Sequence, residues 1–157
     1  MNTISATMYQ SKHTRSAHPV FTIDGTPISS WIKGIIYDHL GEDDTDGLVP
    51  AQGWLTDEDH SAYAWQLLSP LEEDSSTIVP LLICPDDMDL SCTVAVVEQV
   101  VRGEKIVWAR FGRAVKVING IITSVAWTQN NQRAEFEKSQ FLNACEEFKR
   151  LTEHEWV

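Results

Sequence analysis

Positive charge is scarce in this sequence. Twelve lysine and arginine residues stand against 23 aspartate and glutamate residues, which gives a formal net charge of −11 at pH 7. A surface of that sign repels phosphate groups, so we expect neither nucleic acid nor an anionic membrane as a direct partner. The charge instead favours a basic protein as the partner.

Long apolar runs are also missing. No stretch approaches the roughly 18 consecutive apolar residues of a membrane span, and the N-terminal segment MNTISATMYQSKHTRSAHP lacks the apolar core of a signal peptide. We therefore expect a cytoplasmic protein. At 157 residues, of which 43% are hydrophobic, the chain is long enough for one domain. We place it at residues 19–157, after a flexible and solvated N-terminal arm at residues 1–18.

Recognisable catalytic motifs are absent as well. Gly103, Gly112 and Gly120 fall in predicted hairpins, and a phosphate-binding loop would need its glycines between a strand and a helix. No serine lies in a nucleophile-elbow pattern, and the five histidines are scattered along the chain. We therefore expect no enzymatic activity and no cofactor.

Cysteine is rare, and its count is odd. The three cysteines, Cys84, Cys92 and Cys145, all lie in apolar-patterned segments. This placement favours reduced, buried thiols over a disulfide framework. A disulfide between Cys84 and Cys92 could form only if the strands that carry them pair with each other.

The sequence does contain a β-rich centre. Stretches at residues 78–84, 93–101 and 105–110 are rich in β-branched and aromatic residues and predict three strands. Asn119-Gly120, between two further apolar stretches, predicts a second hairpin.

Helical spacing of apolar residues predicts a helix at each end of this centre. The first would begin at Pro27 and end near Leu40, and the second would cover residues 134–151. Residues 60–68 fit both a helix and a strand, and we favour one helical turn followed by a strand. The predicted fold class is α+β, an antiparallel sheet of five to six strands with an N-terminal helix and a C-terminal helix packed on it.

Carboxylates are concentrated in two segments, of which the first is GEDDTDG at residues 41–47. Like charges this close together resist regular structure and favour an exposed loop. Their hard oxygen atoms suggest calcium, but an EF-hand loop counted from Asp43 would need glycine where Leu48 stands and glutamate where Trp54 stands. We therefore assign no metal site here.

The second acidic segment is CPDDMDLSC at residues 84–92. A zinc site is a poor match, because zinc knuckles space their cysteines only two to four residues apart. An acid/base pair is also disfavoured, because adjacent aspartates on a turn point apart. We favour a structural turn that begins at Pro85 and is held by the side chain of Asp86 or Asp87. The main alternative is a loop whose carboxylates contact a partner. The candidate partner-binding residues of the two segments are Glu42, Asp43, Asp44, Asp46, Asp86, Asp87 and Asp89.

Two other functions stay open beside partner binding. One is a small metal-dependent hydrolase that would use Asp86, Asp87 and Cys92. The other is a structural subunit whose acidic surface only provides solubility.

The segments TIDGTPISSW and VPLLICPDDMDLSCTVAVVE, followed by IVWARFG, resemble sequences of immunity proteins from bacterial toxin systems, including contact-dependent growth inhibition. The resemblance covers most of residues 20–150. It implies a small acidic α+β protein that binds and neutralises one cognate toxin, commonly a basic nuclease. It carries over no functional residues, because such families diversify at the binding surface.

Overall fold

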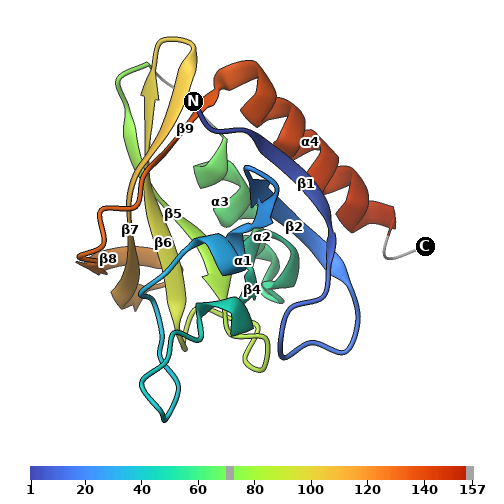
Figure 1. Cartoon of the computed structure of the whole chain (residues 1–157), viewed down its shortest axis with the longest axis vertical. Coiled ribbons are helices and arrows are strands. Elements are labelled where there is room, and N and C mark those ends of the chain that lie inside the picture. The colour runs from blue at the N-terminus through green and yellow to red at the C-terminus, as the bar shows by residue number, and fades with distance from the viewer. Residues whose placement is uncertain (70–72, 155–157) are drawn as a thin grey trace.

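Two antiparallel sheets form the framework of the protein. The computed structural model describes residues 1–69 and 73–154. The smaller sheet has the order β1-β2-β3, with β1 at Ile4–Tyr9, β2 at His18–Ile23 and β3 at Thr26–Pro27. Figure 1 shows this sheet beside the C-terminal helix α4 (Lys138–His154) on one side of the molecule, with the larger sheet on the other side.

The larger sheet has six strands, which confirms the predicted α+β class with an antiparallel sheet of that size. Its order is β4-β5-β6-β7-β8, and β9 pairs with β7. The strands are β4 (Val49–Pro50), β5 (Ser76–Ile83), β6 (Val94–Arg102), β7 (Lys105–Ile118), β8 (Ile121–Trp127) and β9 (Ala134–Glu137). Because β5 and β6 pair with Ile83 opposite Val94, the residues that follow β5 lie beside those that precede β6.

The N-terminal residues form a strand in place of the expected arm. β1 pairs with β2 from Ile4 opposite Ile23 to Tyr9 opposite His18. Ile4 is buried and Ala6 partly buried, and α4 packs on this strand. Ile4, Ala6 and Met8 alternate with polar residues as in a half-buried strand, but the run is short and polar residues surround it.

The predicted N-terminal helix at 27–40 is wrong beyond its first turn. Only α1 (Ile28–Trp31) is helical, and Ile32 is already extended. The next three amides bond to distant side chains, since those of Lys33, Gly34 and Ile35 donate to Gln132, Asp43 and Thr45. Gly34 also has a φ of +83°, which ends any helix. Ile28, Ile32 and Ile35 of this segment are nevertheless buried in the core, whereas Leu40 at its predicted end is exposed.

Residues 60–68 are helical, so the preferred turn followed by a strand is wrong. Helix α3 covers Glu58–Leu68, and the side chain of Asp57 accepts hydrogen bonds from the amides of Asp59 and His60 as its cap. Ala64 and Leu68, four residues apart, are its buried positions. The alternating aromatic residues that suggest a strand lie only half-buried on the helix.

Aromatic side chains fill the core between the sheets and α4. Trp108 contacts the rings of Phe111, Phe136 and Phe141 edge to face, and Phe21 stacks on Phe148 of α4 at 4.7 Å between ring centroids.

The predicted C-terminal helix begins four residues later than expected, because residues 134–137 form β9. No helix within residues 1–69 or 73–154 has both the length and the apolar character needed to cross a membrane.

The hairpin of β7 and β8 turns at Asn119 and Gly120, as predicted, with φ of +51° and +81°. β7 runs unbroken through Phe111 and Gly112, beyond the end of the strand predicted at residues 105–110. A Cβ at position 112 would lie 2.6 Å from the carbonyl oxygen of Ala126, so glycine permits the close approach of β8. β8 ends the order of the larger sheet and leaves one of its edges unpaired by the described strands.

Candidate functional site

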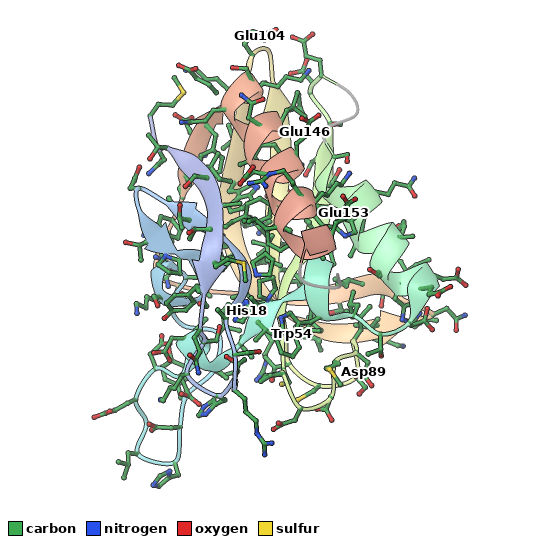
Figure 2. All side chains as sticks on the ribbon, turned by 90° about the vertical axis from the view of Figure 1, so that its right-hand side faces the viewer. His18, Trp54, Asp89, Glu104, Glu146 and Glu153 are labelled. Carbon is green, nitrogen blue, oxygen red and sulfur yellow. The ribbon has the colours of Figure 1, made fainter. Side chains whose placement is uncertain are left out.

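The two acidic segments lie at the same end of the molecule. Figures 1 and 2 place the loop at residues 38–44 and the loop at residues 84–93 at the lower end, together with the loop at residues 10–17. Figure 2 also shows that the two acidic loops lie on different sides of that end. The hairpin of β6 and β7 points to the opposite end, where Glu104 is labelled.

In the first acidic segment, two of the four carboxylates bond to other parts of the chain. Asp43 accepts hydrogen bonds from the amides of Gly34 at 2.7 Å and Thr45 at 2.9 Å. Burial raises the pKa of Asp43, but the hydrogen bonds lower this pKa by more than burial raises it. The pKa of Asp43 therefore lies below its ordinary value. Asp44 pairs with Lys12 at 2.7 Å, and this hydrogen bond lowers the pKa of Asp44.

The other two residues of this segment differ in exposure. Glu42 is exposed and available to a partner. Asp46 is half-buried, and its Oδ1 has no hydrogen-bond partner among the described residues. Of the four carboxylates predicted to bind a partner here, the structure thus leaves Glu42 as the fully exposed one.

The second acidic segment presents its charge more openly. Asp86 and Asp87 are exposed. Asp89 is half-buried and accepts hydrogen bonds from the hydroxyl and amide of Ser91, which lower the pKa of Asp89. Met88 adopts a φ of +53° in this turn, and its amide donates to the carbonyl oxygen of Cys84 at 3.2 Å.

A third acidic group, which sequence analysis did not assign to a site, lies beside this segment. Asp57, Glu58 and Asp59 are exposed at the start of α3. They are held next to the second segment because both the amide and the hydroxyl of Thr56 donate to the carbonyl oxygen of Met88. We call Asp57, Glu58, Asp59, Asp86, Asp87 and Asp89 the acidic rim. In the sequence, residues 57–59 indicate only a helix start, and no local signal connects them to residues 86–89.

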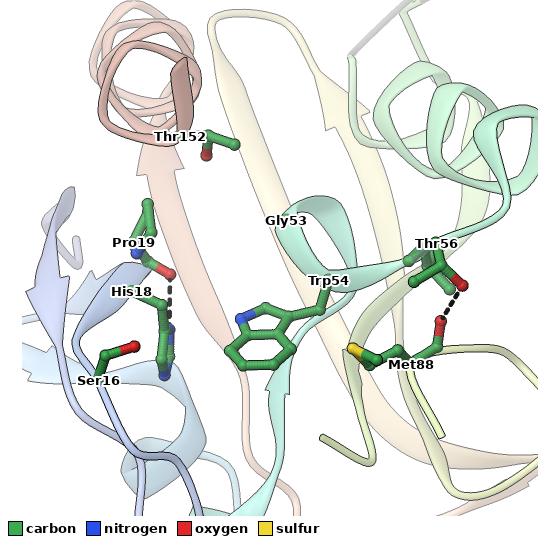
Figure 3. Close-up of a pocket in the computed structure, with 9 residues that line it drawn as sticks. Ser16, His18, Pro19, Gly53, Trp54, Thr56, Met88 and Thr152 are labelled. Atoms are coloured by element: carbon green, nitrogen blue, oxygen red, sulfur yellow. Dashed lines mark hydrogen bonds between the residues drawn. The ribbon is translucent and has the colours of Figure 1, made fainter. Parts of the chain in front are cut away.

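The acidic rim borders a pocket of about 580 Å³. Figure 3 shows side chains from four parts of the chain around it, with His18 of β2 and Trp54 of α2 (Ala51–Trp54) pointing toward each other. Its lining residues are Ser16, His18, Pro19, Gly53, Trp54, Leu55, Thr56, Met88 and Thr152. None of them is acidic, lysine or arginine, so the pocket is suited to an apolar or aromatic group beside a negatively charged border.

His18 is held firmly at this pocket. Only 2% of its surface is exposed, and its ring packs edge to face against Trp54 at 5.6 Å between centroids. Its Nδ1 lies 3.0 Å from the carbonyl oxygen of Pro19, which can only accept, so Nδ1 donates. Its Nε2 lies 2.7 Å from the hydroxyl of Ser11. The sequence places His18 in a solvated arm, because nothing local indicates that β1 covers it.

Near the pocket, two cysteines and one aspartate form a compact cluster. The Sγ atoms of Cys84 and Cys92 lie 2.7 Å apart, and a carboxylate oxygen of Asp87 lies within 4.8 Å of both. The hydrogen bond to the Cys84 thiol and burial raise the pKa of Cys92 to about 11, and the Asp87 carboxylate adds to this rise. Asp86 is not a member of the cluster, so the predicted trio of Asp86, Asp87 and Cys92 is not brought together as such.

Comparison with models of protein families, with curated proteins and with solved structures yields no match to this chain.

Proposed function

We propose that this protein is an immunity protein that binds and neutralises one cognate toxin of a bacterial toxin system. The toxin would be a basic protein, most simply a nuclease domain, and binding would take place in the cytoplasm. The acidic rim would face the basic groove with which such a nuclease holds its nucleic-acid substrate. The pocket at His18 and Trp54 would receive an apolar or aromatic side chain of the toxin.

The observation that carries this proposal is the position of the acidic rim beside an apolar pocket. Exposed carboxylates from two segments some thirty residues apart gather at one border, and the net charge of the chain is −11. Such a field accelerates the encounter with a basic partner, and an apolar anchor slows its dissociation. The resemblance of the segments around residues 22–31 and 79–98 to immunity proteins supports the same function.

The first experiment is co-expression with the product of the neighbouring gene. A stable one-to-one complex, in which the partner's nuclease activity is inhibited, is the expected result. A neighbouring product that is soluble and inert, and that never co-purifies with this protein, would count against the proposal.

The second experiment locates the surface with two charge-matched variants. Glu58→Lys with Asp86→Lys changes the acidic rim, whereas Glu104→Lys with Glu146→Lys changes exposed glutamates near the opposite end (Figure 2). Each pair shifts the net charge from −11 to −7. We expect the rim variant to lower the association rate about tenfold at low salt, and the control to lower it far less. Equal losses from both variants would assign the effect to total charge and not to this surface.

The second candidate function is a small metal-dependent hydrolase. It is favoured by one observation, the cluster of Cys84, Asp87 and Cys92. Two thiolates and a carboxylate can hold zinc and leave a fourth position for water. Metal analysis of the purified protein tests it, because this function requires one metal ion per chain that is lost on Asp87→Ala.

A further inference from the structure

We propose that Cys84 and Cys92 form an intrachain disulfide that closes the loop between β5 and β6. Cys84 directly follows β5, and Cys92 lies two residues before β6. The pairing of Ile83 with Val94 places them at the open end of the same hairpin. Their Sγ atoms are 2.7 Å apart, whereas a disulfide bond is about 2.05 Å long. A small movement of two side chains therefore suffices to form the bond.

The sulfur spacing also separates a disulfide from a metal site. Two thiolates on one tetrahedral zinc ion, each at about 2.3 Å from the metal, stand roughly 3.8 Å apart. The sulfurs of Cys84 and Cys92 are more than 1 Å closer than that, so zinc would have to push them apart.

The accessibility of the two thiols sets the order of the chemistry. Cys92 is exposed and Cys84 is half-buried. The Cys92 thiolate attacks one sulfur of a low-molecular-weight disulfide, RSSR, and expels one RS⁻, which leaves a mixed disulfide at Cys92. The Cys84 thiolate then attacks the Cys92 sulfur and expels the second RS⁻. Two thiol protons pass to the two leaving thiolates, so RSSR is reduced to two RSH while the cysteine pair is oxidised.

The disulfide would fix the residues that border the pocket. The loop it closes contains Met88, which lines the pocket and accepts the hydrogen bonds from Thr56. It also contains Asp86, Asp87 and Asp89. Oxidation would thus hold this turn in the conformation described above, and reduction would release its covalent restraint. This inference does not depend on which molecule the acidic rim binds.

The test is thiol counting on the purified full chain, equilibrated with mixtures of reduced and oxidised glutathione. After alkylation, the number of modified cysteines should fall from three to one as the mixture becomes more oxidising, and the intact protein should lose two hydrogen atoms. Trypsin leaves both cysteines on the peptide between Lys33 and Arg102, so a protease that cleaves before aspartate is needed. Its fragments carrying Cys84 and Cys92 should stay joined until a reductant is added.

Two variants complete the design. Cys145→Ser should leave this behaviour intact, with the count falling from two to zero. Cys92→Ser should abolish the loss of two hydrogen atoms. The proposal is overturned if all three cysteines remain alkylatable in the most oxidising mixture, if the bond forms between two chains, or if one zinc ion per chain protects both thiols.

Discussion

The indole Nε1 of Trp108 donates a hydrogen bond to Oε1 of Gln99 at 2.9 Å, in the buried core of the larger sheet. The amide nitrogen of the same Gln99 side chain donates to the carbonyl oxygen of Leu68 at the end of α3, also at 2.9 Å. One buried amide thus connects β6, β7 and α3. Gln99 is only 2% exposed. If its amide were removed, the indole N–H of Trp108 and the carbonyl oxygen of Leu68 would therefore have no water molecule as a substitute hydrogen-bond partner.

We therefore predict that Gln99→Leu, which keeps most of the side-chain volume, lowers the free energy of unfolding by about 2–4 kcal/mol. Urea denaturation followed by tryptophan fluorescence measures the change. The exposed Gln129 provides the control, and Gln129→Leu should change the free energy of unfolding by less than about 0.5 kcal/mol. A similar small change at Gln99 would show that the core tolerates the unpaired groups.

A second prediction concerns acid stability and Asp43. Hydrogen bonds from Gly34 and Thr45 hold the pKa of Asp43 below its ordinary value of 3.8, although burial acts in the opposite direction. A lowered folded-state pKa contributes stability that is fully present above pH 3.8 and is lost as the pH falls through the folded-state pKa. Asp43→Asn should therefore cost about 1–2 kcal/mol near neutral pH and flatten the dependence of stability on pH below 4.

Urea titrations at several pH values between 2 and 7 measure this dependence. Glu42→Gln is the matched control, since Glu42 is a neighbouring exposed carboxylate. If the two variants give the same pH profile, the role assigned to the Asp43 hydrogen bonds is wrong.

The sequence predicts the elements that a few adjacent residues determine, and it does not predict those that depend on contacts between remote segments. The central strands and the turn at Asn119 and Gly120 follow from β-branched runs and one dipeptide, and all are confirmed. The predicted N-terminal helix does not continue past its first turn, because the next amides donate hydrogen bonds to the side chains of Gln132, Asp43 and Thr45. Asp43 and Thr45 belong to the loop that the sequence marks only as acidic. Pairing between remote segments, which no local pattern encodes, decides that outcome.

The candidate site likewise combines a part that the local sequence predicts with parts that it does not. The exposed loop at residues 84–92 follows from Pro85 and its aspartates. Its neighbours do not, because Asp57–Asp59 and the pocket at His18 reach it through contacts made only in the folded chain. Conversely, Asp43 and Asp44 look like free surface charge in the sequence, but their side chains bond to Gly34 and Lys12.

A third prediction uses two glycines with opposite surroundings. A Cβ at Gly112 would lie 2.6 Å from the Ala126 carbonyl oxygen and 2.8 Å from Cγ1 of Val125, so Gly112→Ala should cost at least about 2 kcal/mol. A Cβ at Gly53 would meet Phe148 only at 3.8 Å, and Gly53 lies in α2. Gly53→Ala should thus be neutral or stabilise the protein by up to about 1 kcal/mol. Thermal unfolding of both variants distinguishes them, and equal effects would contradict the crowding described between β7 and β8.

A fourth prediction concerns the reactivity of Cys92. The Cys84 thiol, burial and the Asp87 carboxylate raise the pKa of Cys92 to about 11, while the amide of Thr93 acts in the opposite direction. Since the thiolate is the reactive form, the initial rate with a small disulfide should rise about tenfold per pH unit between pH 7 and 9. In a Cys145→Ser background, Asp87→Asn should raise the rate at a given pH. A rate that is already flat across this range would show that Cys92 ionises much more easily.

A fifth prediction follows from the closure of the loop at residues 84–92. In the chain-entropy description, a bond across nine residues stabilises the folded state by about 2.5 kcal/mol. The oxidised protein should therefore melt several degrees above the reduced protein, and Cys92→Ser should make the melting temperature independent of the redox conditions. Stabilisation by oxidation in the Cys92→Ser variant would locate the effect elsewhere.

The open edge of β8 has a consequence for how the protein behaves when concentrated. Its sequence, IITSVAW, holds no charged residue and no proline, and Val115, Ile118 and Ile121 of the same hairpin are exposed. Such a strand is a template on which further strands can add, and natural sheets usually protect their edges with lysine, proline or a bulge. The pairing of β7 with β8 shifts register at two places, but β8 itself has neither lysine nor proline. Self-association of this protein should therefore begin at β8 despite the strong mutual repulsion of its molecules, and a single lysine at Ser124 should suppress it.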